Sequence, residues 1–356
     1  MSTYPMIEAN LSLLKHNVEV IKAACDAQDV QLAAVTKVVC ADERIAQSLI
    51  AAGVSMLADS RAENLRVLPQ ALPRLSLRIA DPLQAEEIVL HSEYSLQSGA
   101  DAIAAIGQAA ERLNKPHKVI LMIDLGDLRE GIYHKNRDLI RQTAASVAAH
   151  KQLSLAGIGT NLTCFGGILP DEGNLGVLTD IARDLREGLG LPIPIISGGN
   201  SSSLHLLFEG KLPKGINHLR IGEGLMRGMD TSCSEPFPQL SQRVFTQYAR
   251  LVEVYDKPSK PEGKTGPNAF GEEVHFEDYG PMVRGILAIG RQDTDAEGLM
   301  PLDPQVRILG ASSDHLLVDL SRTKGYEVGD VLGFTPSYGA LLKAYTSQYI
   351  TKSVTE

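Results

Sequence analysis

From about residue 30 to residue 223, short runs of β-branched and aliphatic residues alternate with longer segments whose apolar residues recur at helical spacing. A strand followed by a helix, repeated along a chain, is typical of a parallel sheet, and eight such units close into a barrel. The sequence therefore predicts an α/β fold with a (β/α)8 barrel of the TIM type. The eight expected strands are residues 30–37, 54–60, 75–80, 93–98, 119–126, 155–162, 193–200 and 218–223.

The segments between these runs have helix signals at their ends. Residues 41–53 carry Asp42 near the start and Gly53 at the end, and residues 98–114 are rich in alanine. We expect these helices, and the others of the repeat, to cover the outside of the barrel with their apolar faces.

After about residue 235 the pattern changes, and helical periodicity almost disappears. Loops rich in proline and glycine alternate with strand-like runs at 248–256, 283–290, 315–320 and 329–334. The sequence therefore predicts two domains: a barrel over residues 1–235 and a smaller C-terminal β domain over residues 236–356. A first strand near residues 4–9 is a candidate member of the β domain.

Length and composition limit the classes of partner. The 356 residues suffice for one large domain and a smaller one, and the net charge of −9 argues against a nucleic-acid partner. The four cysteines lack metal-ligand or disulfide spacing, so we expect no metal site and a reducing, cytoplasmic location. The N-terminus has no secretion-signal pattern, and no apolar run approaches the roughly 18 residues of a membrane span, so we expect no membrane association.

The ends of the expected strands carry a group of polar residues. In a (β/α)8 barrel the active site lies at the carboxyl ends of the strands. At these ends the sequence places Lys37, Arg129, Asn161, residues 198–203, and Arg220 with Gly222. We therefore expect the chemistry at this edge of the barrel.

Lys37 ends the apolar run of the first strand. An amine held in a partly desolvated barrel mouth can have a lowered pKa and attack an aldehyde to form a Schiff base. A lysine that extends its ammonium group into water at a strand end is the structural alternative. Lys37 alone does not distinguish the two.

Residues 197–204, SGGNSSSL, begin in the last part of the seventh expected strand and continue past its end. The two glycines let the backbone approach a ligand closely, the serines offer hydroxyl groups, and the amides at the start of the next helix point outward. These are properties of a phosphate site, although an ordinary Asn/Ser helix cap uses the same residues. A phosphate site in a barrel whose first strand ends in lysine suggests pyridoxal phosphate as cofactor.

Arg220 leaves the eighth strand toward the barrel mouth, and Gly222 beside it leaves room for a ligand. A guanidinium group there can hydrogen-bond the pyridine nitrogen of the cofactor and, because it stays protonated, keep that nitrogen unprotonated. The ring is then a weaker electron sink, which disfavours transamination. An arginine on the protein surface is the alternative interpretation.

Taken together, these strand-end residues and the β domain that follows resemble the pyridoxal-phosphate-dependent alanine racemase family. The opening IEANLSLLKHNVEVIK is similar to the family's first strand and helix. DLGDLREG, GTNLTCFGG, SGGNSSSL, LAIGRQDTD, GASSDHLLVDL and SYGALLKAYTSQYI resemble the ornithine racemase branch, and the likeness covers essentially the whole chain. The resemblance implies a barrel followed by a β domain, pyridoxal phosphate, and a homodimer with composite active sites.

The resemblance also implies roles for individual residues. Lys37 would bind the cofactor and act as one of two proton-transfer bases, Arg220 would face the pyridine nitrogen, and Arg129 would lie near the phenolic oxygen. Asp314, with His315 beside it, falls near the segment that meets substrate in the partner subunit's site. The other residues implied at the cofactor, chiefly around its phosphate, are Asn161, Asn200, Ser201, Ser202, Gly222, Glu223 and the hydroxyl group of Tyr338.

Two positions depart from the family pattern. Arg291 stands where the family has a tyrosine as the second base, and Asn161 replaces the histidine that supports that tyrosine. Because two members of one hydrogen-bonded unit differ together, the sequence suggests a rebuilt second base. The candidates are His315, Asp293, Asp295, Cys164 and Tyr133, each of which also has an ordinary structural interpretation.

Acidic residues of the C-terminal domain bear on the substrate. Asp293, Asp295 and Asp314 could pair with a terminal ammonium group, which would favour ornithine or lysine over alanine. Aspartates in a surface loop are the alternative. The sequence leaves open the preference among ornithine, lysine and arginine, and the physiological direction.

We therefore expect an amino-acid racemase that interconverts L- and D-ornithine or a related basic amino acid. A basic amino-acid decarboxylase or an aldolase on the same fold is an alternative, because similar decarboxylases place an acid at the pyridine nitrogen and Glu223 lies close in sequence to Arg220. A non-catalytic protein that binds pyridoxal phosphate is a second alternative, against which the additional β domain argues.

Overall fold

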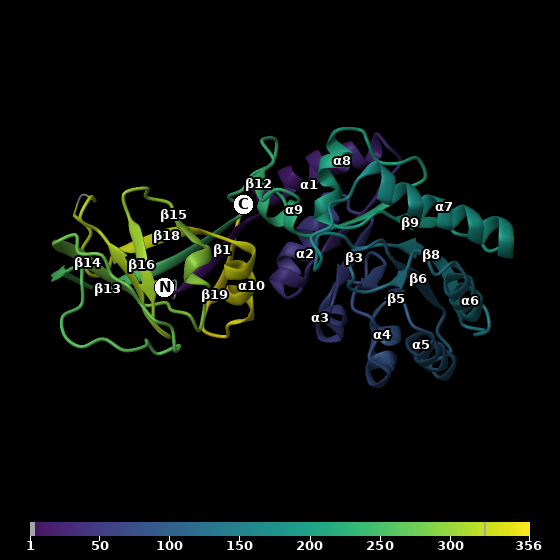
Figure 1. Ribbon diagram of the computed structural model, residues 1–356, viewed down its shortest axis with the longest axis horizontal. Helices are drawn as coiled ribbons and strands as arrows, with labels where there is room; N and C mark the ends of the chain where they lie inside the picture. The colour runs from purple at the N-terminus through teal and green to yellow at the C-terminus, as the bar shows by residue number, and fades with distance from the viewer. Residues whose placement is uncertain (1–3, 324) are drawn as a thin grey trace. The chain divides into compact units, whose positions relative to one another are not determined.

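The computed structural model describes residues 4–323 and 325–356 (Figure 1). The chain divides into two compact units: residues 11–242 form one, and residues 4–10 with 243–356 form the other. The domain boundary expected at residue 235 falls within β12 (Glu235–Pro236), and the residues up to 242 stay with the first unit. They are tied there by hydrogen bonds such as that from the Ser241 amide to Asn17 Oδ1, at 2.7 Å.

Eight parallel strands of the first unit close into a barrel, as the sequence predicts. Each strand pairs with its neighbours in chain order, and β2 pairs with β10 to complete the ring. Each of the eight expected runs contains most or all of a strand, although β4 is short and only the first two residues of 75–80 lie in it. The strands are β2 (Gln31–Val35), β3 (Met56–Asp59), β4 (Arg74–Ser76), β5 (Tyr94–Gln97), β6 (His117–Asp124), β8 (Leu153–Gly159), β9 (Ile195–Ser197) and β10 (His218–Ile221).

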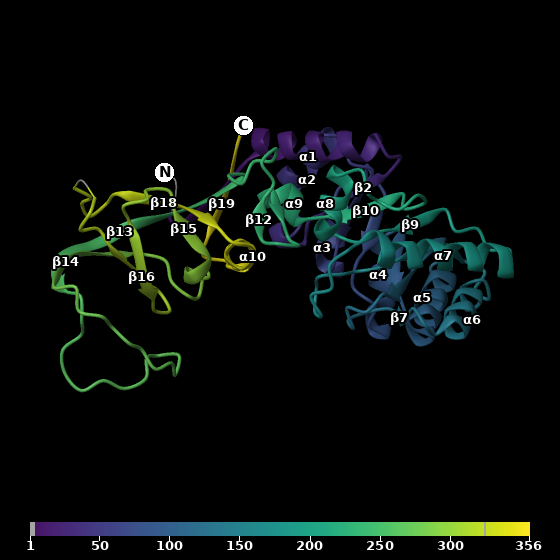
Figure 2. The same ribbon diagram turned by 45° about the horizontal axis from the view of Figure 1, so that its top comes forward.

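Helices surround the barrel in both views (Figure 1, Figure 2). An apolar layer between strands and helices includes Val119 and Leu121 of β6, Ile103 of α5 and Ile181 of α7. The expected helix at 41–53 is α2, for which Asp42 accepts a hydrogen bond from the Arg44 amide. The helices are α1 (Leu11–Asp26), α2 (Glu43–Ala51), α3 (Ala62–Val67), α4 (Ala85–His91), α5 (Ala100–Arg112), α6 (Arg137–Val147), α7 (Glu172–Leu189), α8 (Leu204–Phe208) and α9 (Glu223–Arg227).

The inside of the barrel is apolar along most strands and polar at β9 and β10. Ala33 and Val35 of β2 belong to the interior apolar cluster. In the parallel register Arg220 is opposite Ala33, and His218 is opposite Ser197 of β9. Because paired residues of neighbouring strands point to the same face, these three polar side chains point into the barrel.

The second unit is a largely antiparallel sheet of eight strands with one longer helix, α10 (Tyr338–Thr346). The N-terminal strand β1 pairs antiparallel with β13 and parallel with β19, so it belongs to this sheet. The sequence pattern predicted β1, β13, β14, β17 and β18, but not β15, β16, β19 or α10. The strands are β1 (Met6–Asn10), β13 (Phe245–Pro258), β14 (Pro281–Leu287), β15 (Leu299–Pro301), β16 (Arg307–Ala311), β17 (Leu316–Asp319), β18 (Val331–Pro336) and β19 (Thr351–Thr355).

Candidate active site

Lys37 lies in the turn that follows β2 rather than in the strand. A short 3-10 turn, Lys37–Val39, begins at this residue. The backbone just before it is anchored, because Thr36 Oγ1 donates to Asp59 Oδ2 at 2.8 Å and both side chains are buried. The Lys37 side chain itself is exposed. Its amine is therefore accessible at the carboxyl edge of the barrel.

Arg220 is buried, with only 2% of its surface exposed, so the interpretation as a surface arginine is wrong. Its Nη2 donates to the Thr160 carbonyl at 2.6 Å and to Asn161 Oδ1 at 2.8 Å, and its Nη1 donates to Ser197 Oγ. Burial lowers the pKa of Arg220 to about 10, which leaves the guanidinium group charged at neutral pH. The barrel therefore holds a fixed positive charge.

Asn161 connects Arg220 to a carboxylate that the sequence did not single out. The Asn161 side-chain Nδ2 donates to Glu130 Oε1, and Arg129 Nε lies 2.8 Å from Glu130 Oε2. Three expected residues, Arg129, Asn161 and Arg220, thus form one network through Glu130. The only sequence signal for Glu130 was its place beside Arg129 after the fifth barrel strand.

Ser197 and His218 extend this network into the barrel. Ser197 Oγ accepts from Arg220, so its own proton is available to His218 Nδ1, 2.7 Å away. Burial lowers the pKa of His218 to about 3, so the ring is neutral at physiological pH. The sequence does not mark either residue as functional, because each looks like an ordinary strand residue until β9 and β10 are paired.

The serine segment after β9 has features of both interpretations that the sequence allowed, an ordinary Asn/Ser helix cap and a phosphate site. Asn200 accepts from the Ser202 amide at 2.9 Å, and Ser201 Oγ accepts from the amides of Gly222 at 3.3 Å and Gly224 at 3.1 Å. The Ser202 hydroxyl is buried and has no hydrogen-bond partner among the described residues. A Cβ at position 222 would lie 3.2 Å from Val35 Cβ, so a glycine here lets the backbone after β10 pack closely against the end of β2. The unpaired, buried hydroxyl of Ser202 leaves a hydrogen-bond donor in this segment that fits a phosphate group.

The carboxylate of Glu223 is paired with another residue of its own helix, Arg227, and not with Arg220. The decarboxylase alternative placed an acid at the pyridine nitrogen, and the buried charged residue that β10 contributes to the inside of the barrel is Arg220 instead. This charge pattern weakens that alternative.

Asp127, another residue missed in the sequence, fixes the loop that follows β8. Its buried carboxylate accepts from the amides of Cys164 at 3.2 Å, Phe165 at 2.9 Å and Ile168 at 3.2 Å. Loss of water around its thiol raises the pKa of Cys164, so this candidate base is a neutral thiol at physiological pH. Tyr133, on the short strand β7 (Ile132–Tyr133), is exposed.

Arg291, Asp314 and His315 come together on two adjoining loops of the second unit. The Arg291 amide donates to the Ser312 carbonyl at 2.8 Å, and the Ser312 amide donates to the His315 carbonyl at 2.9 Å. Arg291 Nη1 lies 2.9 Å from Glu272 Oε1, and its guanidinium group lies 4.4 Å from the centre of the Phe270 ring. Arg291 is thus engaged with a carboxylate and an aromatic ring.

The remaining expected residues of this unit have different environments. Asp293 accepts from the Ser347 hydroxyl at 2.7 Å, whereas the side chain of Asp295 is exposed. Tyr338 is half-buried and begins α10. These residues and the barrel residues form two groups, each within its own unit.

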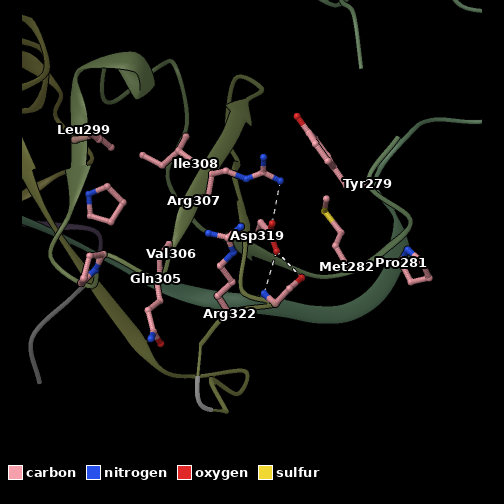
Figure 3. A pocket seen from close by; sticks show the side chains of 13 residues that line it. Tyr279, Pro281, Met282, Leu299, Gln305, Val306, Arg307, Ile308, Asp319 and Arg322 are labelled. Carbon is pink, nitrogen blue, oxygen red and sulfur yellow. Dashed lines mark hydrogen bonds and ion pairs between the residues drawn. The ribbon is translucent and has the colours of Figure 1, made fainter. Parts of the chain in front are cut away.

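A cavity of about 640 Å³ in the second unit is lined by Tyr279, Met282, Arg307, Asp319 and neighbouring residues (Figure 3). Arg307 Nη2 lies 3.0 Å from Asp319 Oδ2, so these two charges compensate each other. None of the expected site residues lines this cavity. Among residues 4–323 and 325–356, no group of three or more His, Cys, Asp or Glu is placed to hold a metal ion, and no helix is both long and apolar enough to cross a membrane.

A closed parallel barrel with a lysine at the first strand end, and an antiparallel domain after it, is the architecture of the alanine racemases. Residues 9–229 match the family model described as "Alanine racemase, N-terminal domain", and the chain belongs to this family. The fold is similar to that of alanine racemase from Streptomyces coelicolor, with a TM-score of 0.76, 18% identity, and coverage of 99% of this chain and 98% of that chain.

Two relatives of known activity are similar along nearly their whole length. The chain is 42% identical to ornithine racemase from Acetoanaerobium sticklandii over 353 residues, which cover 99% of both chains. It is 36% identical to lysine racemase from Thermotoga maritima over 352 residues, or 98% of both chains. Both relatives are racemases whose names specify a basic amino acid.

Proposed function

We propose that this protein is a pyridoxal-phosphate-dependent racemase of basic amino acids with ornithine as its substrate. The observation that carries the proposal is the full-length similarity to ornithine racemase at 42% identity, above the 36% to lysine racemase. The buried, charged Arg220, for which the family resemblance implies contact with the cofactor, supports the same chemistry. A cytoplasmic location is part of the proposal.

The barrel offers groups suited to each part of the cofactor. Lys37 would bind the aldehyde carbon, Asn200, Ser201 and Ser202 with the backbone at Gly222 and Glu223 would surround the phosphate, and Arg220 would meet the ring nitrogen. When bound, the cofactor supplies an electron-withdrawing ring that makes the α-hydrogen of an amino acid acidic. Tyr338 is proposed as a further phosphate contact from the β domain.

Arg220 sets how strongly that ring can withdraw electrons. Its guanidinium group is a donor only, and its pKa of about 10 keeps the proton on the arginine at neutral pH. A ring nitrogen that accepts this hydrogen bond stays unprotonated. The residue therefore favours return of a proton to the α-carbon over transamination.

Proton transfer needs a base on each face of the α-carbon. We propose Lys37 Nζ for one face, because its backbone is anchored and its side chain is exposed. For the other face, Asp314 and His315 are exposed on the loop beside Arg291, and a partner subunit in a homodimer would present them. The neutral thiol of Cys164 is a poorer candidate, since its raised pKa leaves it protonated.

Carboxylates of the same loops are proposed to select the terminal ammonium group of ornithine. Asp293→Asn tests this idea cleanly, because asparagine Oδ1 can still accept from Ser347 while the charge is lost. KM for ornithine should rise about tenfold while activity on alanine changes little. Equal losses with ornithine and alanine would rule out charge recognition by Asp293.

The function itself is tested with the purified protein, pyridoxal phosphate and single L-amino acids. Chiral chromatography should detect D-ornithine as the fastest-formed product, followed by D-lysine, with D-alanine slowest. Carbon dioxide release with L-ornithine would instead indicate a decarboxylase. Unchanged amino acids from a protein that binds the cofactor would indicate the non-catalytic alternative.

A further inference from the structure

The positive charge of Arg220 is held by uncharged acceptors. Its guanidinium group donates to the Ser197 hydroxyl, the Thr160 carbonyl and the Asn161 amide oxygen. A buried cation that is held by dipoles alone is costly, so a nearby carboxylate matters even without direct contact. Glu130 is the principal group that raises the pKa of Arg220 against the effect of burial.

The Asn161 amide is oriented from both sides. Its oxygen accepts from Arg220 at 2.8 Å, and its Nδ2 donates to Glu130. If the amide turned over, its NH2 group would face the guanidinium donors and its oxygen would face the carboxylate. Glu130 therefore fixes the orientation in which Asn161 can hold Arg220.

Glu130 also stands between two cations. Its side chain is only 14% exposed, and its second oxygen lies 2.8 Å from Arg129 Nε. Arg129 lowers the pKa of Arg220, as a nearby like charge should. One carboxylate thus links and partly neutralises the two arginines for which the family resemblance implies positions near the pyridine nitrogen and the phenolic oxygen of the cofactor.

We propose that Glu130 is a positioning residue that acts through Asn161 as the counter-ion of Arg220 and fixes its guanidinium group toward the cofactor ring. The inference rests on the proposed function for its chemical consequence. The coupling of Glu130 to Arg220 is measured through the affinity for the cofactor, so this part of the inference can be tested even if the protein has no racemase activity.

The test variant is Glu130→Gln, which keeps the size and one acceptor oxygen but removes the charge. Glu187→Gln is the matched control, the same change at an exposed position of α7. The apparent Kd for pyridoxal phosphate, measured by absorbance titration without substrate, should rise about tenfold in Glu130→Gln and stay unchanged in Glu187→Gln. With L-ornithine, the fraction of turnovers that end in pyridoxamine phosphate and a keto acid should also rise.

The coupling is tested by repeating the titration in an Asn161→Ala background. If Glu130 acts through Asn161, Glu130→Gln should change the Kd there by less than about twofold. A tenfold effect in both backgrounds, or wild-type affinity in Glu130→Gln, would overturn the proposal. Should Glu130→Gln not fold, Asn161→Ala alone breaks the same link, and unchanged affinity in that variant would overturn it. A wild-type protein that binds the cofactor but does not racemise would refute the proposed function and leave these titrations interpretable.

Discussion

Ser197→Ala removes one hydroxyl group that two buried side chains share. Ser197 Oγ accepts from Arg220 and lies 2.7 Å from His218 Nδ1, and all three residues are buried. Leaving a buried polar group unpaired costs about 1–3 kcal/mol, and two groups lose a partner, so the free energy of unfolding should fall by about 3 kcal/mol. For a unit of about 200 residues, this loss lowers Tm by about 6–12 °C.

Differential scanning calorimetry of the cofactor-free protein measures this shift. Ser154→Ala is the control, because Ser154 is an exposed residue of β8 and its loss should change Tm by no more than about 2 °C. If Ser197→Ala melts within that margin of the wild type, the hydroxyl does not satisfy the two buried groups, and the account of the Arg220 network is wrong.

Three further predictions concern buried groups of the barrel unit. His218 and His117 have pKa values of about 3 and about 4 in the folded protein, below the usual 6.5. The unfolded chain therefore binds protons first, and the free energy of unfolding should fall progressively as pH drops from about 6.5 toward 4. Chemical denaturation across this pH range measures the change, and a free energy of unfolding that does not vary with pH would contradict the prediction. Asp127→Asn removes the charged acceptor shared by three backbone amides, so amide hydrogen exchange in the loop after β8 should become faster. Unchanged exchange rates would show that the Asp127 charge does not stabilise this loop. Burial raises the pKa of Cys25 to about 12, so a thiol reagent should leave it unmodified in the native protein while the exposed Cys233 reacts, and equal reaction would refute this assignment.

The barrel could be predicted from the sequence because each strand–helix unit carries its own local signals. Apolar runs and helix caps such as Asp42 depend on neighbours a few residues away. Strand ends were less predictable, since they depend on pairing between strands. Within the expected run 30–37, the strand β2 ends at Val35, and the side chain of the next residue, Thr36, donates a hydrogen bond to Asp59 of the neighbouring strand. The helix α10 went unpredicted within a domain of otherwise alternating pattern.

Within the candidate site, the predicted residues are those that strand position and family resemblance mark. Arg220 and Asn161 were found this way, and the structure brings them into contact. Glu130, Ser197 and His218 were missed because their role arises from side-chain contacts between β9, β10 and the loops after β6 and β8. A serine and a histidine 21 residues apart give no signal until the register of two strands places them together.

We propose that this barrel moves the α-proton of ornithine on both faces, at a site that depends on Lys37. The most direct measurement incubates the protein and pyridoxal phosphate with L-ornithine in deuterated water, and follows optical rotation and α-deuterium by NMR, with Lys37→Ala as control. We predict that rotation decays to zero while deuterium enters the α-position, and that the control shows neither. Deuterium entry at constant rotation would mean that only one face is served, and would contradict racemisation.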